Sequence, residues 1–444
     1  MNVHVMKTEA EETLGAQFEK LAARLPGTDW LAEERVKAIS EFATTGLPNR
    51  RVEEWKYTDL RNRFIRAFEP SDGRHVGASW QAIEAALGRL VSFDSARVVF
   101  VDGAIAPELS NSDDVGDGIE IVALGEALGA PADWLKQTLG KVNVPSKADA
   151  TVTLNTAFMT DGVAVRVGDG ARGSKPLLIV NVATGEAERS ITTRNVVVLG
   201  DRSQLTVIEA HLTLDSAATQ SNTVTELLVG DDANITHIKM QGENLASQHL
   251  GTWMIRLGAH ATYRALQVTT GGALTRNQLY LKFAGEGATA HINGTFLQRH
   301  KQHCDTTMLV DHAVPGCTSR ELFKAVIDDE ARGVFQGKIV VQPQAQKTDG
   351  KQMSQALLLS QTAEFDAKPE LEIFADDVVC GHGATSGQID EDMLFYLRAR
   401  GVPEELAKSL LIQAFVGEAL DIVEDEGIRE ALTKVTERWL ARSD

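Results

Sequence analysis

The segment VVVLGDRSQLTVIE (residues 196–209) contains two short runs of aliphatic and β-branched residues joined at a Gly-Asp corner. Such runs, with turn residues between them, predict two strands linked by a tight turn. Three later segments repeat the arrangement: ELLVGDDANITHI (226–238), WMIRLGAHATYRA (253–265) and YLKFAGEGATAHI (280–292). The repeat decides the fold class, because each copy reads as strand, corner and strand.

The corner glycines recur at a nearly regular interval. Gly200, Gly230, Gly258 and Gly285 are 30, 28 and 27 residues apart, and Gly168 lies 32 residues before the first of them. A period of this size, made of strands and turns, predicts a solenoid. We therefore expect a mainly β protein with a right-handed parallel β-helix core. A sandwich with regular hairpins is the main structural alternative.

The ends of such a solenoid need caps, because the first and last coils present unpaired strand edges. Hydrophobic residues at helical spacing occur on both sides of the repeats and can supply them. Near the C-terminus, Asp390 is expected to cap a helix that Gly401 ends. We divide the chain into an N-terminal helical region (1–95), a connector (96–149), the β-helix (150–385) and a C-terminal helical region (386–444).

Composition argues against several classes of function. The chain has 44 Lys and Arg against 62 Asp and Glu, a net charge of −18 that repels nucleic acid and anionic membrane surfaces. Its first residues lack the apolar core of a signal peptide, and we find no apolar run of membrane-spanning length. The odd number of cysteines (304, 317 and 380) favours a reducing compartment. We expect a cytoplasmic protein without a nucleic-acid or membrane partner.

One stretch matches the residue pattern of a nucleotide-binding motif but lacks the helix that should follow it. Residues 168–173 (GDGARG) fit GxGxxG, but the strand-like run SKPLLIV follows, so the sequence offers no helix N-terminus for a phosphate. The sequence also lacks GxxxxGK[ST]. An ATP-driven step would therefore come from a partner.

The stretch PELEIFADDVVCGHGATSGQIDEDMLFYLRARG (369–401) carries the main candidate site. Cys380 and His382 are two residues apart, which places them on one face of an extended chain. We expect a tight corner over residues 380–383, with glycines that allow a partner to approach. Thiol and imidazole both ligate soft metals; a buried cysteine beside a satisfied core histidine is the alternative.

A second polar cluster contains His303, Asp305 and His312. Its spacing fits no closed zinc pattern, so a metal could use these residues only if the coils brought them together. We favour the interpretation that these are ordinary polar residues on the coils of the solenoid.

Two motifs carry a family resemblance. The runs LEIFADDVVCGHGAT and LFYLRARG resemble the C-terminal signature of the SufB/SufD family, the scaffold subunits of SUF iron–sulfur cluster assembly, and RVEEWKYT (51–58) resembles its N-terminal signature. SufB-type chains carry a reactive cysteine and an acidic residue where this chain has Ser354 and Gly383. Both departures favour the SufD branch.

The resemblance implies a non-catalytic scaffold that pairs with a SufB-like paralogue, docks the SufC ATPase and can form a homodimer when isolated. Iron or an iron–sulfur cluster would be held transiently at a subunit interface by His382 and Cys380, with no cofactor bound tightly in the isolated chain. Flavin binding stays open, because no flavin-specific motif is present. The implied partner-binding residues are Phe395, Tyr396, Leu397, Leu410, Leu411 and Phe415.

A β-helix enzyme that acts on carbohydrate is the alternative function. It would need paired carboxylates in a groove. Asp376 and Asp377 are available, but neighbouring strand positions point to opposite faces.

Overall fold

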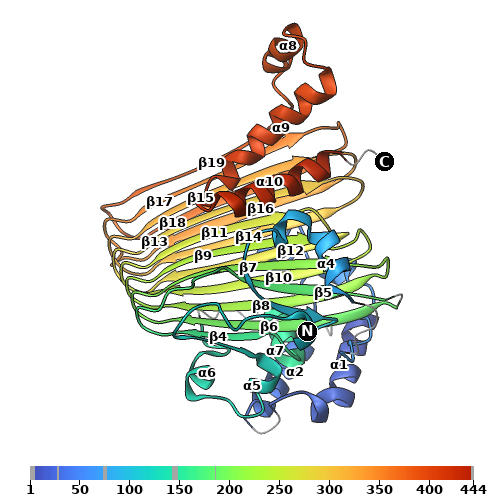
Figure 1. Cartoon of the computed structure of the whole chain (residues 1–444), viewed down its shortest axis with the longest axis vertical. Helices are drawn as coiled ribbons and strands as arrows, with labels where there is room; N and C mark the ends of the chain where they lie inside the picture. Colours follow the sequence, from blue (N-terminus) through green and yellow to red (C-terminus); the bar gives the residue numbers. More distant parts are fainter. Residues whose placement is uncertain (1–5, 28–29, 74–77, 143–148, 186, 442–444) are drawn as a thin grey trace, which may run out of the picture.

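A two-sheet solenoid forms the body of the computed structural model, which describes residues 6–27, 30–73, 78–142, 149–185 and 187–441 (Figure 1). Consecutive strands from β4 onward alternate between the two sheets, and all pairings among these strands are parallel, each joining strands of successive coils. The expected mainly β, parallel β-helix fold is therefore confirmed.

The first sheet has ten strands. In spatial order they are β2 (Ala104–Ile105), β1 (Ala96–Val101), β5 (Leu177–Ala183), β7 (Gln204–Thr213), β9 (Asn234–Gly242), β11 (Thr262–Thr269), β13 (Thr289–Gln298), β15 (Thr318–Ile327), β17 (Asp349–Leu358) and β19 (Val379–Gly387). The second sheet has nine: β3 (Ile119–Ala123), β4 (Val163–Val167), β6 (Arg189–Leu199), β8 (Thr219–Val229), β10 (Gln248–Leu257), β12 (Leu274–Phe283), β14 (His303–His312), β16 (Arg332–Val341) and β18 (Glu364–Ile373).

Helices lie at the start of the solenoid, along its sides and beyond its last coil (Figure 1). They are α1 (Glu9–Leu21), α2 (Ala32–Thr45), α3 (Leu60–Arg63), α4 (Trp80–Leu87), α5 (Leu124–Ala127), α6 (Asp133–Thr138), α7 (Ala150–Phe158), α8 (Glu391–Ala399), α9 (Glu404–Leu420) and α10 (Glu426–Ala441). Short 3-10 turns are η1 (Ala22–Arg24), η2 (Glu53–Trp55), η3 (Gly88–Val91) and η4 (Pro107–Leu109).

The Gly-Asp corners stack at one edge of the solenoid. The N–H of Gly230 donates to Leu199 O at 2.9 Å, and the Asp201 carboxylate accepts from the N–H of Asp231 at 2.9 Å. A Cβ at Gly230 would lie 2.8 Å from the backbone carbon of Gly200, so close stacking of the corners requires glycine. The repeat found in the sequence is thus the repeat of the coils.

Inward side chains fill the lumen with aliphatic and aromatic residues, as in Val197, Leu227, Ile255 and Leu281 of successive coils. Outside, α4, α9 and α10 pack on the ten-stranded sheet, and α1, α2 and α7 form a second layer with outward residues of the nine-stranded sheet. These two covers fix the N- and C-terminal regions to the solenoid.

Residues 150–158, expected to begin the strand region, form helix α7 instead. The Asp149 side chain caps it by accepting from the N–H groups of Thr151 and Val152. Most of its residues, including Thr151 and Thr153, are buried where α7 contacts α2 and the nine-stranded sheet, so tertiary packing overrides their strand propensity. The preceding range 96–149 contributes β1, β2 and β3, which extend both sheets at their start.

The GxGxxG look-alike at residues 168–173 links β4 to β5, so the expected absence of a following helix is confirmed. In the C-terminal region, the side chain of Asp390 caps α8 as predicted. The hydrophobic stripe of α10, which includes Ile428, Leu432 and Trp439, is buried against the body. Helix α8 and the start of α9 project beyond the last coil (Figure 1).

Candidate functional site

The C-terminal coil leaves the solenoid open at one end. Strand β18 is hydrogen-bonded to β16 and strand β19 to β17, and each is the last strand of its sheet. Apolar side chains are exposed there: Phe374 at 60% and Val379 at 61%. An uncovered strand edge with exposed apolar residues is a surface on which another chain can add strands.

The candidate residues Cys380 and His382 lie inside β19, and the predicted tight corner over 380–383 is wrong. The turn lies earlier, between Ile373 and Val379. Neither flanking glycine has a positive φ. A Cβ at Gly383 would lie 2.7 Å from Cε of Met353 on the neighbouring strand, so Gly383 makes room for a cross-strand side chain instead of a turn.

The expectation that Cys380 and His382 share a face is confirmed by the register, in which they stand opposite Gly350 and Gln352 of β17. Cys380 is half-buried against the lumen core, whereas His382 is exposed. Burial first, then Asp349 and Glu321, raise the pKa of the Cys380 thiol. A protonated thiol is a poor nucleophile, and it must lose its proton before it can ligate a metal.

Behind this pair the lumen is polar. Gln352 is in register with Glu321 of β15, so His382, Gln352 and Glu321 form one row across three strands. Glu321 is buried, and burial raises the pKa of its carboxyl to about 8, against the opposing effects of Ser319 and Arg320. Sequence reasoning missed Glu321. It is two residues from the buried Phe323 on the same strand, so the alternation of side chains could have placed it inward.

Glu321 makes the stability of the chain depend on pH. The folded state keeps the carboxyl protonated up to about pH 8, whereas an unfolded glutamate ionises near 4.5. Between these values the folded state binds one more proton, so this group's stabilising effect is lost as the pH rises, by about 1.4 kcal/mol per unit. Glu321→Gln should remove that slope. The unfolding free energy of the variant should therefore fall less between about pH 5.5 and pH 7.5 than that of the wild type, by up to about 3 kcal/mol.

Urea unfolding at both pH values measures this effect, with surface Glu372→Gln as the matched control. Parallel pH profiles for wild type and Glu321→Gln would contradict the assignment.

The second predicted cluster is not one site. His303 and Asp305 lie on the outer face of β14 under residues 53–58, whereas His312, nine positions along the same strand, is stacked on Phe283 in the lumen at 4.4 Å. His312 Nε2 lies 3.0 Å from Ser319 Oγ. Across the described ranges, no three His, Cys, Asp or Glu side chains are placed to hold a metal ion.

The RVEEWKYT run is a strap across the nine-stranded sheet. Trp55 is buried and stacks on the guanidinium of Arg276 at 4.2 Å, and Arg276 pairs with Asp305. Thr58 Oγ1 contacts both Asp305 and His303 Nε2, the latter at 2.8 Å. The aromatic and charged residues of this run therefore hold the N-terminal region on the solenoid.

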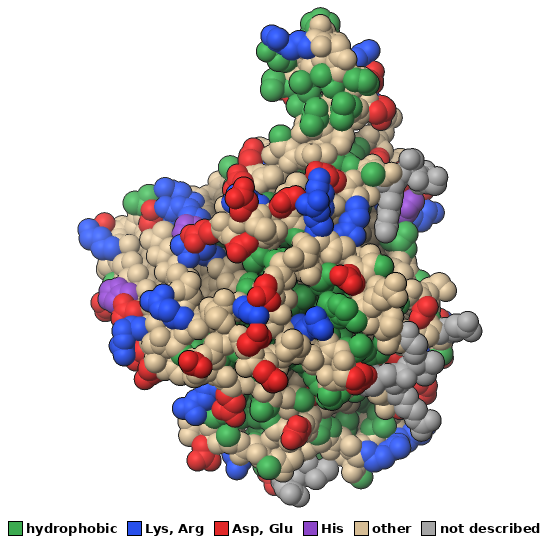
Figure 2. All heavy atoms as spheres, viewed as in Figure 1, with side chains coloured by type: hydrophobic (Ala, Val, Ile, Leu, Met, Phe, Trp, Pro, Cys, Tyr) green, Lys and Arg blue, Asp and Glu red, His purple; other side chains and the backbone are tan. Residues whose placement is uncertain are grey.

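The predicted partner-binding residues divide between two environments. On α8, which buries none of its residues, Phe395 and Tyr396 are 72% and 53% exposed. Leu410 of α9 is also exposed, while Leu397 and Leu411 are half-buried. Helix α8 and the start of α9 form a projecting segment, which we call the knob. Figure 2 shows hydrophobic side chains gathered on it.

Phe415, the remaining member of that set, is half-buried and lies 4.3 Å from the Lys324 ammonium. It therefore belongs to the attachment of α9 to the solenoid.

The carboxylates invoked for carbohydrate chemistry are at the last turn. Asp376 and Asp377 are both exposed, and Asp377 pairs with Lys347. Neither residue lines the cavity of about 550 Å³ that lies between α1, α7 and the first coils. The arrangement gives that alternative no support.

The structure is thus an open-ended parallel β-helix with a thiol and an imidazole on its last strand and an exposed helical projection. The chain belongs to the SufBD family: its residues 181–415 match the family described as "SUF system FeS cluster assembly, SufBD core domain", and residues 16–179 match the SufBD N-terminal region. This assigns the chain to iron–sulfur cluster assembly.

Individual relatives agree over nearly the whole length. The iron–sulfur cluster assembly protein SufD of Escherichia coli is 33% identical over 90% of this chain and 91% of its own. A SufBD family protein of Synechocystis is 31% identical over 94% of this chain and 93% of its own, and SufD of Bacillus subtilis is 24% identical over 92% and 94%. Among the described residues, no helix is long and apolar enough to cross a membrane.

Proposed function

We propose that this chain is a non-catalytic scaffold subunit that pairs with a SufB-like paralogue and supplies ligands to a transient iron–sulfur cluster. The observation that supports this most directly is the position of Cys380 and His382 on the last strand of an open sheet. Ligands at an edge are accessible to a second subunit, and the chain by itself places too few of them to close a metal site among its described residues.

Pairing would use the free edges of β18 and β19. Strand addition satisfies their unpaired backbone groups, and contact with a partner buries Phe374 and Val379. A similar subunit fits best, because its own last coil presents edges of the same length and hydrogen-bond pattern. In the absence of that paralogue, a second copy of this chain can take the same place.

Iron or an iron–sulfur cluster is the cargo at this interface. Neutral imidazole and thiolate are ligands for iron, and metal binding displaces the thiol proton that the free chain retains. His382, exposed on the strand, is the primary ligand in this proposal, and half-buried Cys380 assists it. The complementary ligands come from the paralogue.

ATP-driven movement would come from a SufC-type ATPase bound at α8 and the start of α9. Exposed aromatic residues on a projecting helix are typical of a partner-binding surface. The chain itself has no phosphate-binding loop of the GxxxxGK[ST] type. The knob thus offers the energy-supplying subunit a place to attach.

Co-expression of the chain with SufB-type and SufC-type partners tests the role of His382. His382→Ala should lower the iron and sulfide retained by the purified complex at least about five-fold, since a ligand is lost, while the three subunits still co-purify. His300→Ala, at an exposed corner away from β19, is the matched control.

Unchanged iron and sulfide in His382→Ala would remove this residue from the proposal. Failure of the wild-type chain to co-purify with either partner would overturn the scaffold role itself.

A further inference from the structure

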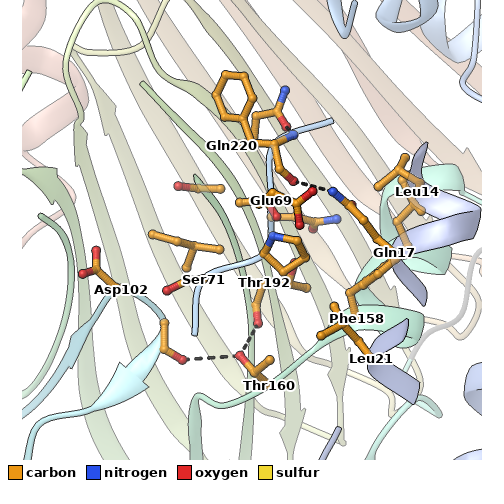
Figure 3. A pocket seen from close by; sticks show the side chains of 18 of the residues that line it. Leu14, Gln17, Leu21, Glu69, Ser71, Asp102, Phe158, Thr160, Thr192 and Gln220 are labelled. Carbon is orange, nitrogen blue, oxygen red and sulfur yellow. Dashed lines mark hydrogen bonds between the residues drawn. The ribbon is translucent and has the colours of Figure 1, made fainter. Parts of the chain in front are cut away.

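A cavity of about 550 Å³ separates the N-terminal helices from the first coils (Figure 3). It lies between α1, α7, the segment 68–73 and the beginnings of β6, β8 and β10. Protein interiors are close-packed, and voids larger than a water molecule are few. A cavity of this volume within a packing layer is in the size range of small-molecule sites.

Most of its wall is apolar. Leu21 comes from α1, Phe158 from α7, Leu250 from β10 and Ile191 from β6. Phe158 and Leu250 are buried members of the hydrophobic cluster that joins the N-terminal helices to the solenoid. These side chains offer a surface to the apolar body of a ligand, whose transfer from water would be favourable.

One polar group inside the cavity lacks a partner. Gln17 is buried, and its Nε2 donates to Phe68 O at 3.0 Å, but its Oε1 accepts no hydrogen bond from a described residue. By contrast, the carboxylates of Asp102 and Asp161 are occupied by Arg189 and Thr184 and by backbone N–H groups, respectively. Gln17 Oε1 is therefore an acceptor that a bound molecule could satisfy.

Two cations line the rim on the helical side. Lys20 and Arg24 are exposed and four residues apart, and neither forms an ion pair or a hydrogen bond with a described residue. In a chain of net charge −18, such unpaired cations beside an apolar cavity favour an anionic ligand group. Glu69 also lines the cavity and is exposed, so its carboxylate would disfavour an anion bound near it.

We propose that this cavity binds an amphipathic anion, with its apolar body against Leu21, Phe158 and Leu250 and its acidic head at Lys20 and Arg24. A ligand that also donates a hydrogen bond could reach Gln17 Oε1. This site is separate from the open end of the solenoid, and the proposal does not depend on the cluster-scaffold role.

Dodecanoate is the probe, and dodecanol, which has the same chain length and no charge, is its neutral counterpart. Isothermal titration at low ionic strength should show saturable one-to-one binding of dodecanoate to the full chain, at least about five-fold tighter than dodecanol. The double variant Lys20→Glu and Arg24→Glu should remove that difference, and Glu69→Gln should strengthen dodecanoate binding. Lys37→Glu, an exposed site on α2, is the matched control.

Two filling variants, Leu21→Trp and Ser71→Trp, approach the cavity from different walls. Thermal unfolding identifies which of them folds, and binding of both probes should be lost in a folded one. Absence of saturable binding to the wild type, equal affinity for the two probes, or full binding by a folded filled variant would each overturn the proposal.

Discussion

Combining Phe395→Asp with Tyr396→Asp is expected to abolish co-purification of a SufC-type ATPase with this chain. Both side chains are exposed on α8, and exposed aromatic residues at the centre of an interface commonly contribute about 2 kcal/mol or more each. Charged replacements would also place unpaired carboxylates in the contact. We therefore expect affinity to fall by at least about 100-fold, measured by pull-down and by calorimetry with the purified ATPase.

The same change should leave the fold intact, which separates docking from stability. Helix α8 buries none of its residues, so the unfolding free energy should change by less than about 0.5 kcal/mol. Leu245→Asp, an exposed apolar residue on a distant turn, is the matched control and should retain the ATPase. Full retention by the α8 variant, or equal loss in both, would contradict a docking role for the knob.

The fold could be predicted largely from its corners. Gly200, Gly230 and Gly258 fixed the length of a coil, because stacked turns admit no Cβ and therefore recur once per turn of the solenoid. Helix α7 could not be predicted in the same way. Its strand-like composition is overridden by burial between α2 and the nine-stranded sheet. The local sequence pattern does not indicate this packing.

At the candidate site, the sequence predicted which side chains share a face of the strand, but it did not predict where the turn lies. The two-residue spacing of Cys380 and His382 correctly placed both on one face, while the neighbouring glycines suggested a corner that the strand does not make. For His303 and His312, an odd separation on one strand already places them on opposite faces. The contact of His303 with Thr58, 245 residues away in the chain, depends on tertiary structure alone.

Asp305→Ala is expected to lower the unfolding free energy by about 3–5 kcal/mol. Asp305 and Arg276 form a fully buried ion pair, and removal of one partner leaves the other charge uncompensated in a medium that solvates it poorly. Arg276 also stacks on Trp55 and donates from Nη2 to Glu54 O at 2.7 Å, so its displacement should loosen the strap over residues 53–58. Urea unfolding measures the first effect, and limited proteolysis of the N-terminal region measures the second.

Lys338→Ala, which breaks the partly exposed Lys338–Glu372 pair between β16 and β18, is the matched control on the same sheet. An exposed pair contributes about 1 kcal/mol or less, because water already solvates both charges. If Asp305→Ala costs no more than this control, the buried pair does not hold the strap. A large loss of stability with unchanged proteolysis would instead mean that Trp55 remains anchored by its apolar packing, since the cation–π contact and the ion pair would then act independently.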